Sequence, residues 1–416
     1  MNILIVHQYY LGKKDAGGSR WNQFAKYWSQ MGHKVTVLAG TVHYATGQKL
    51  PDYKGRFVVR EKGTENVEIL RCYVSESYNK SFIGRFWAYL SFSISSIWAG
   101  LFHTGRCDVI ICTSPPLTVG LTGWILSSLK RIPMVFEVRD LWPESAIDTG
   151  VLTNKWLIKM SYWLEKKSYS SSSWINVLTP AFEKALVKKK GISPDKISMI
   201  PNGADIDIVK PGPRDNWVRE KYKFNNKFVV TYVGAHGVAN ALMQLVEAGK
   251  ILKEKDQQVQ IVLVGDGMEK PKLIEAIRKF GLDNVTFIDP VPKSQITDYL
   301  NASDVCTAVL KKCDTFKTVY PNKVFDYMSA AKPTIVAIDG IARELVEDAE
   351  AGLYVEPENP QSFAEAVLKL KGNAELCTTY GKNGLDFVRQ NFNRHTLAKN
   401  YIDILVNEVT CAKNKE

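Results

Sequence analysis

The sequence lacks the marks of a secreted, zinc-binding or membrane-spanning protein. Its seven cysteines, at positions 72, 107, 112, 306, 313, 377 and 411, form no CxxC pair, and few of them lie near a histidine. This spacing argues against a disulfide framework and against a zinc site. The first residues, MNILIVHQYY, carry no basic segment and too short an apolar run for a signal peptide. They indicate a first buried strand and a chain that remains in the cytoplasm.

Signatures of nucleic-acid binding are also missing, although the formal net charge is +11. Residues 1–200 hold 26 lysines and arginines against 14 aspartates and glutamates, whereas residues 201–416 hold 28 against 29. No helix-turn-helix, zinc finger or aromatic RNA-binding motif accompanies the basic half. We therefore expect this half to meet an anionic membrane surface, and no nucleic acid.

Two similar openings organise the chain into two α/β domains. Residues 3–6 predict a strand, and a glycine loop, a helix near 21–31 and the strand HKVTVLAG follow. The order recurs later as KFVVTYVG, a glycine turn, a long helix and VQIVLVGDG. This order is typical of parallel, Rossmann-like sheets, and we expect two such domains to present their strand ends to a shared cleft. Residues 41–66 read as a polar loop.

The stretch from Thr318 to Pro333, TVYPNKVFDYMSAAKP, has the pattern of a binding site. Asn322 is expected to cap a helix that begins with Lys323, because apolar residues recur at helical spacing over 324–328. A helix start offers unpaired backbone N–H groups and the positive end of the dipole, to which Lys323 adds a full charge. This suits a nucleoside diphosphate whose ribose hydroxyls bind Asp326. The alternative is an ordinary surface helix.

The segment from Lys80 to Arg106 is rich in aromatic residues and has basic residues at both ends. Its uncharged part is near the lower length limit for a membrane span and holds five serines, which favours an interfacial helix over a span. Lys80, Arg85 and Arg106 would meet anionic lipid, and the aromatic residues would lie at headgroup depth: Phe82, Phe86, Trp87, Tyr89, Phe92 and Trp98. The alternative is that these aromatic side chains pack the helix on the sheet.

Polar residues also gather at the end of the strand in IPMVFEVRDLWPES. Ligands of open parallel sheets bind beyond the carboxyl ends of the strands. Glu137, Arg139, Asp140 and Glu144 are therefore candidates for a site. Arg139 and Asp140 could instead form a structural ion pair.

Taken together, GGSR, EVRDLWPES, PNGAD, GDG and YPNKVFDYMSAAKP resemble the motifs of the retaining glycosyltransferases of family 4, of the bacterial surface-polysaccharide type. The resemblance covers essentially the whole chain and implies the GT-B fold, with two Rossmann-like domains facing a central cleft. Residues 1–192 plus 394–416 would form the N-terminal acceptor-binding domain. Residues 193–393 would form the C-terminal domain for the nucleotide sugar. The resemblance also implies that no cofactor and no metal ion is needed.

The resemblance assigns site residues one by one. Catalysis would rest on Lys323, Arg139 and Asp140. Donor binding would involve Gly17, Gly18, Arg20, Gly234, His236, Gly265, Asp266, Lys270, Val291, Thr318, Tyr320, Pro321, Asn322 and Asp326.

The chain departs from the family pattern at two places. The first of the family's two glutamates, eight positions apart, falls on the neutral Thr318, and the second falls on Asp326. The chain therefore lacks the first carboxylate, which the family uses near the donor sugar, and keeps one for the ribose. An Arg and a Lys commonly follow the glycine turn of the second domain, but Ala235 and His236 stand there. Lys323, and after it Lys270, would have to supply that charge.

The reaction that the resemblance implies is retaining transfer of a sugar from a UDP-linked donor, with an N-acetylated sugar as one candidate, to a lipid-linked glycan acceptor at the inner face of the cell membrane. The departing diphosphate would be received by Lys323 and the glycine turns, as preorganised donors placed where charge develops. A sugar-nucleotide epimerase on the same fold and a non-catalytic nucleotide-sugar-binding protein remain alternatives. An NAD oxidoreductase is disfavoured, because neither glycine turn has the dinucleotide spacing.

Overall fold

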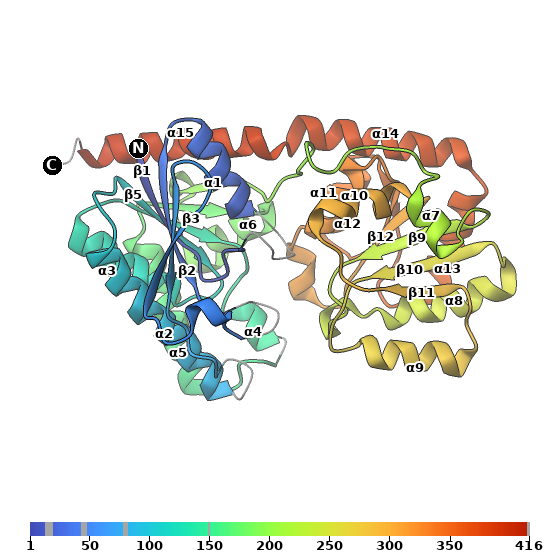
Figure 1. The fold of residues 1–416 in the computed structure, drawn as a ribbon, viewed down its shortest axis with the longest axis horizontal. Coiled ribbons are helices and arrows are strands. Elements are labelled where there is room, and N and C mark those ends of the chain that lie inside the picture. The colour runs from blue at the N-terminus through green and yellow to red at the C-terminus, as the bar shows by residue number, and fades with distance from the viewer. Residues whose placement is uncertain (13–19, 43–47, 78–81, 149, 414–416) are drawn as a thin grey trace. The chain divides into compact units, whose positions relative to one another are not determined.

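The computed structural model describes residues 1–12, 20–42, 48–77, 82–148 and 150–413. The described part of the chain divides into two compact units, one formed by residues up to 201 together with residues 395–413 and the other by residues 202–394 (Figure 1). The sequence-based boundary lay at residue 192, so the first unit extends further along the chain than expected. Its additional part contains the last strand of its sheet.

The first unit is built on an eight-stranded sheet in the order β3-β4-β2-β1-β5-β6-β7-β8. All neighbouring strands are parallel except β3 and β4. The strands are β1 (Asn2–Val6), β2 (Lys34–Gly40), β3 (Val58–Lys62), β4 (Val67–Cys72), β5 (Val109–Ser114), β6 (Met134–Val138), β7 (Trp174–Val177) and β8 (Ile197–Met199). Residues 41–66 were expected to form a polar loop, but they contain the edge strand β3.

The helices of the first unit cover this sheet. They are α1 (Arg20–Gln30), α2 (Phe82–Phe102), α3 (Val119–Lys130), α4 (Glu144–Asp148), α5 (Lys155–Ser171), α6 (Pro180–Lys190) and, from the far end of the chain, α15 (Arg394–Lys413). The last helix packs against α1: the indole of Trp28 donates to the Ala398 carbonyl at 2.8 Å, and Tyr401 contacts the rings of Trp21, Phe24 and Trp28. This aromatic cluster holds the C-terminal segment on the first unit.

The second unit is built on a six-stranded, fully parallel sheet in the order β11-β10-β9-β12-β13-β14. The strands are β9 (Phe228–Val233), β10 (Val259–Val264), β11 (Val285–Ile288), β12 (Val305–Val309), β13 (Thr334–Ala337) and β14 (Gly352–Tyr354). The helices are α7 (Trp217–Tyr222), α8 (Met243–Lys255), α9 (Lys270–Phe280), α10 (Lys293–Asn301), α11 (Asn322–Ser329), α12 (Ile341–Asp348), α13 (Pro360–Lys371) and α14 (Ala374–Asn391). The central strands are buried on both faces, as parallel sheets between helices require.

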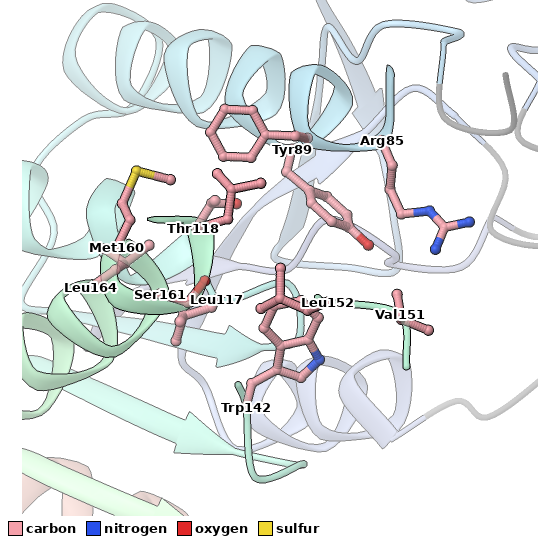
Figure 2. A pocket seen from close by; sticks show the side chains of 12 residues that line it. Arg85, Tyr89, Leu117, Thr118, Trp142, Val151, Leu152, Met160, Ser161 and Leu164 are labelled. Carbon is pink, nitrogen blue, oxygen red and sulfur yellow. The ribbon is translucent and has the colours of Figure 1, made fainter. Parts of the chain in front are cut away.

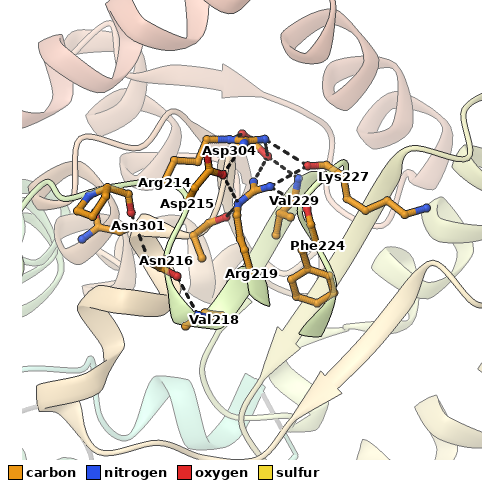
Figure 3. A network of polar contacts seen from close by, with 12 residues as sticks. Arg214, Asp215, Asn216, Val218, Arg219, Phe224, Lys227, Val229, Asn301 and Asp304 are labelled. Atoms are coloured by element: carbon orange, nitrogen blue, oxygen red, sulfur yellow. Dashed lines mark hydrogen bonds and ion pairs between the residues drawn. The ribbon is translucent and has the colours of Figure 1, made fainter. Parts of the chain in front are cut away.

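A buried polar network fixes α7 on the second sheet (Figure 3). The guanidinium of Arg219 is fully buried and pairs with Asp304 at 2.6 Å. It also donates to the carbonyls of Ala302, Phe224 and Lys227. Because a buried charge is costly unless it is paired and hydrogen-bonded, this network ties α7 to the segment before β12.

Candidate active site

The helix predicted at Lys323 exists and begins one residue earlier than expected. α11 starts with Asn322 itself, and Pro321 takes the N-cap position without a side-chain hydrogen bond. Because Asn322 lies inside the helix and Pro321 takes the N-cap position, the prediction that the Asn322 side chain caps the helix is wrong. The apolar residues of the predicted face, Val324, Phe325 and Met328, are buried in the second unit. Asp326, which lies between them in sequence, is half-buried.

Lys323 lies beside the turn that follows β9. Its ammonium is 3.7 Å from the ring centroid of Tyr232, a geometry that stabilises a cation. The Tyr232 hydroxyl is fixed in turn at 2.9 Å from the Ala235 carbonyl and 2.8 Å from Asn240 Oδ1. A Cβ atom on Gly234 would lie only 2.8 Å from the lysine Nζ. Glycine is therefore needed for the lysine to approach this turn.

The charge of Lys323 has no counter-ion among the residues that the structure describes. Neither a carboxylate nor a hydrogen-bond acceptor of these residues pairs with its ammonium, although the side chain retains some solvent exposure. Burial lowers its pKa from 10.5 to about 7. The second unit thus holds an amine without a counter-ion among the described residues, charged in about half of the molecules at pH 7, at the carboxyl ends of its strands, which is where such sheets bind ligands.

The turns after β9 and β10 pack directly on each other. A Cβ atom on Gly265 would lie 2.0 Å from the Gly234 carbonyl oxygen, and one on Gly267 would lie 2.5 Å from the His236 carbonyl oxygen. Both glycines have positive φ angles, of 144° and 159°. The backbone N–H of His236 donates to the Asp266 carbonyl at 2.8 Å. The sequence motifs YVGAHG and VGDG therefore form one compact backbone surface.

His236 lies inside this surface with no hydrogen bond to either ring nitrogen among the described residues. Burial, followed by the charge of Lys270, lowers its pKa to about 4, so the imidazole is neutral at pH 7. A fully buried ring without partners is rare, and its nitrogens can accept or donate one hydrogen bond each to a ligand. Asp266 is exposed, and its carboxylate accepts from the N–H of Gly267.

Lys270, the second candidate for holding a diphosphate, is already paired. Its ammonium lies 2.7 Å from a carboxylate oxygen of Asp289 and 3.2 Å from the Gly265 carbonyl. Lys323 has no such partner among the described residues. The structure therefore favours Lys323 over Lys270 as the cation available to an anionic ligand.

Asp326 is half-buried on α11, one turn after Lys323, and carries no ion pair or hydrogen bond to its carboxylate among the described residues. Burial raises its pKa, while the charges of Lys293 and Arg394 oppose that rise. Both cations pair with the buried carboxylate of Asp205. Asp326 is thus an available acceptor, as binding of ribose hydroxyls would need.

The remaining predicted donor residues of the second unit have structural contacts. The Thr318 hydroxyl donates to the Thr315 carbonyl at 2.7 Å. The ring of Tyr320 packs edge-on against Phe325, and burial raises its pKa to about 12. Val291 packs on the apolar cluster beside β10 and β11. Their contacts with a donor, like those of Pro321, stay predictions.

Arg20 has structural contacts in the first unit, and its predicted contact with the donor stays a prediction. Its guanidinium is buried and pairs with Glu137 at 3.0 Å. It also donates to the carbonyls of Ile200 and Pro201. Its two Nη groups make these contacts, whereas its Nε has no hydrogen-bond partner among the described residues. Gly17 and Gly18, which were predicted with it, lie outside the described residues, as does Lys80.

Arg139 and Asp140 follow β6 at the carboxyl edge of the first sheet. Both are half-buried. Asp140 accepts a hydrogen bond from the Ser145 hydroxyl at 2.8 Å, and burial raises its pKa. Glu144, the other acidic candidate of this stretch, pairs with Lys190 of α6 and thus has a structural contact.

His7 and Gln8, at the end of the central strand β1, are residues that the sequence analysis missed. Both are buried, and neither the His7 Nδ1 nor the Gln8 Oε1 has a hydrogen-bond partner among the described residues. Burial, and after it the charges of Arg139 and Arg71, lowers the pKa of His7. Their position just beyond a strand end is the signal that would have found them, by the rule that selected Arg139.

No group of three or more histidine, cysteine, aspartate or glutamate side chains in the described part of the chain has the geometry of a metal site. Within the same residues, no helix is both long and apolar enough to cross a bilayer.

Two protein-family models match this chain. "Glycosyl transferase 4-like domain" matches residues 16–203, and "Glycosyl transferases group 1" matches residues 213–387. An uncharacterized glycosyltransferase of Methanocaldococcus jannaschii is 23% identical over 251 residues, which are 58% of this chain and 62% of that protein. The chain thus matches less than two thirds of that relative. The putative colanic acid biosynthesis glycosyl transferase WcaI of Escherichia coli K12 is 21% identical over 401 residues, 93% of this chain and 97% of WcaI.

Solved structures share the fold. The crystal structure of Anabaena HepE in complex with UDP and glucose has a TM-score of 0.71 at 19% identity and covers 98% of this chain and 100% of HepE. At this identity the likeness establishes the architecture only. The first family model matches the chain of the first unit, and the second matches the chain of the second unit. Both agree with the motifs and with the two sheets. The chain belongs to the family 4 glycosyltransferases, and its fold is GT-B.

Proposed function

We propose that this enzyme transfers a sugar from a nucleoside diphosphate sugar to a hydroxyl group of a lipid-linked glycan acceptor, with retention at the anomeric carbon. The observation that carries the donor class is the cation of Lys323, which lies against a glycine turn without a counter-ion among the described residues. A diphosphate is dianionic and would neutralise it. HepE, which shares the fold, was crystallised with UDP, and this favours a uridine donor.

The chemistry follows from where charge develops. When the glycosidic bond breaks, the diphosphate gains negative charge and the sugar gains positive charge. Lys323 and the backbone N–H groups at the start of α11 stabilise the leaving group, and one such preorganised donor is typically worth about 2.7 to 4 kcal/mol. No metal ion takes part in the proposed mechanism, because Lys323 supplies the positive charge.

Retention does not require a carboxylate nucleophile in this proposal. The acceptor hydroxyl attacks from the face that the diphosphate leaves, and a phosphate oxygen takes its proton. We assign Arg139 and Asp140 to orienting the sugar and the acceptor. His236 accepts or donates a hydrogen bond at the donor, since its ring nitrogens have no partner among the described residues.

The first unit supplies the proposed contact with an anionic membrane. On α2 the aromatic residues divide between two environments: Phe92 is fully buried, whereas Trp87 and Trp98 are about half exposed at 49% and 50%. The expectation that Phe92 reaches lipid is wrong, because it packs in the core. Ile94 and Phe102 continue the exposed face of Trp87 at helical spacing.

A second exposed face, on α5, combines aromatic and basic residues. Trp156 is 81% exposed and Trp163 56% exposed, and Lys155, Lys159 and Lys166 project from the same side of the helix. This side carries no acidic residue. Aromatic rings among lysines are typical of helices that lie on anionic lipid. We propose that the protein acts at the inner face of the cell membrane, attached peripherally through this unit.

The experiment that tests the function compares products with and without a lipid acceptor. The enzyme is incubated with UDP-sugars and a bacterial lipid extract, and UDP release and nucleotide-sugar composition are measured. Transfer predicts UDP release that depends on the extract, together with a glycosylated lipid whose anomeric configuration matches that of the donor. An isomerised nucleotide sugar without UDP would show an epimerase. Binding without any product would show a nucleotide-sugar-binding protein.

Membrane attachment has its own test. Co-sedimentation with vesicles that contain one third phosphatidylglycerol should be strong at low salt and should be mostly lost at high salt, since exposed charges are screened. Replacing Trp156 and Trp163 by serine should weaken it further. Attachment that ignores both salt and these substitutions would contradict the proposal.

A further inference from the structure

A hollow in the first unit is not used by the donor chemistry. It lies between α2 and α5, and the segments before α3 and α5 close it (Figure 2). The space free of atoms is about 720 Å³, including its open mouth. All its described lining residues belong to the first unit, and none is among those assigned to the nucleotide sugar.

The walls of this hollow are almost entirely apolar. α5 contributes Leu157, Met160 and Leu164, while Leu117 and Leu152 come from the segments before α3 and α5. Figure 2 shows the rings of Tyr89 and Trp142 facing the same space. A sugar or nucleotide would lose its hydration there without gaining enough hydrogen bonds, so the walls select a hydrocarbon.

Arg85 is the only charged residue among the described residues that line the hollow. Figure 2 shows its guanidinium at one end of the hollow, near Val151, which is itself exposed at the surface. An arginine is suited to bind a phosphate. The arrangement therefore combines an apolar space with a cation at its end.

The helix α5 connects this hollow with the proposed membrane surface. The side of α5 that carries Leu157, Met160 and Leu164 lines the hollow, and the side with Trp156 and Trp163 lies in solvent. When the exposed side lies on lipid, a lipid chain can reach the hollow along the same helix.

We propose that this hollow binds the hydrocarbon segment next to the phosphate of the lipid-linked acceptor, with Arg85 at the phosphate. The proposal rests on the proposed function, because a lipid acceptor is part of it. It adds the position at which the enzyme holds the lipid, and it explains why α2 has tyrosine, phenylalanine and arginine on one side and exposed tryptophans on the other.

The test fills the hollow and measures binding of single-chain phosphates. Ser161 lines the hollow and is small, so Ser161→Phe places a ring inside it. The matched control is Ser128→Phe, at an exposed position of α3 that does not line the hollow. Titration calorimetry of the full chain uses farnesyl phosphate and dodecyl phosphate below their micellar concentrations, with inorganic phosphate as the chain-free probe.

We expect the natural protein and Ser128→Phe to bind at least one of the two amphiphiles, and Ser161→Phe to bind it at least tenfold more weakly. Inorganic phosphate should not bind detectably at the same concentrations. Tighter binding of farnesyl phosphate would identify a polyprenyl chain, and tighter binding of dodecyl phosphate an acyl chain. Equal binding by the natural protein and Ser161→Phe would overturn the proposal.

UDP binding, measured by thermal shift, shows whether each variant is folded and separates the two proposals. If Ser161→Phe loses UDP binding, Leu157→Asn replaces it, because it makes the same wall polar without adding volume. A natural protein that binds UDP but neither amphiphile overturns the lipid site and leaves the transfer reaction standing. Amphiphile binding that is sensitive to Ser161→Phe, without UDP release from any UDP-sugar in the presence of lipid extract, overturns the transfer reaction alone.

Discussion

Replacing Lys323 by methionine should slow sugar transfer far more than it affects folding. The substitution keeps much of the apolar side chain and removes the charge that the diphosphate would meet. Loss of one preorganised donor at developing charge costs about 2.7 to 4 kcal/mol, which corresponds to a roughly 10²- to 10³-fold fall in kcat. The ammonium has no ion pair among the described residues, so no carboxylate of this part is left unpaired by the change.

Stability should respond differently from turnover. Burial holds the pKa of Lys323 at about 7 in the folded protein, against 10.5 in the unfolded chain. The unfolded state therefore binds more protons between these values, and the charged lysine costs stability at pH 7 and below. We expect Lys323→Met to unfold at the same temperature as the natural protein or higher at pH 6.

The assay measures initial rates of UDP release at saturating donor and thermal unfolding of the same samples. Lys382→Met, at an exposed position of α14, is the matched control and should leave both quantities unchanged. A Lys323→Met enzyme whose kcat stays within threefold of the natural value would refute the reasoning. A rate that falls only together with unfolding would refute it as well.

Three further predictions follow from the same structure. Affinity for UDP-glucose should fall as the pH rises above about 7, by at most tenfold per pH unit, because Lys323 must be protonated in the complex and the diphosphate does not titrate near neutrality. Calorimetry between pH 6 and 9 measures this affinity, and a flat profile would contradict the prediction. Glu137→Gln leaves the buried Arg20 unpaired and should lower the free energy of unfolding by about 3 to 5 kcal/mol in urea titrations; a loss below 1 kcal/mol would show that the pair is dispensable. Arg219→Met removes the central cation of the network around Asp304 (Figure 3) and should destabilise the second unit by a similar amount, about 3 kcal/mol, in the same titrations; unchanged unfolding would count against a structural role.

The sequence was sufficient for the fold class and for the helix at Lys323. Parallel, buried strands read as near-continuous apolar runs, and the spacing of Val324, Phe325 and Met328 identified the buried face of α11. The edge strand β3 was missed because its residues are exposed or half-buried and carry no apolar alternation. Pairing with β4, which is a tertiary contact, decides its conformation.

Side-chain directions were less predictable than elements. Arg20 follows a glycine loop, but its guanidinium is directed to Glu137, which is far away in sequence and adjacent only in the folded unit. Likewise, aromatic residues of α2 occur on both its sides, so composition alone did not separate buried Phe92 from exposed Trp98. The exposed face of α5 could have been found, because Trp156 and Trp163 recur at helical spacing among lysines.

The most direct measurement is a crystal structure of the enzyme with a bound UDP-sugar. The account predicts a diphosphate oxygen within about 3 Å of Lys323 Nζ, the distance of a charge-assisted hydrogen bond. It also predicts that the glycine turns at Gly234 and Gly265 contact the donor and that Asp326 lies at the ribose. A diphosphate bound elsewhere, with Lys323 Nζ remaining over the Tyr232 ring and contacting no phosphate oxygen, would contradict the central claim.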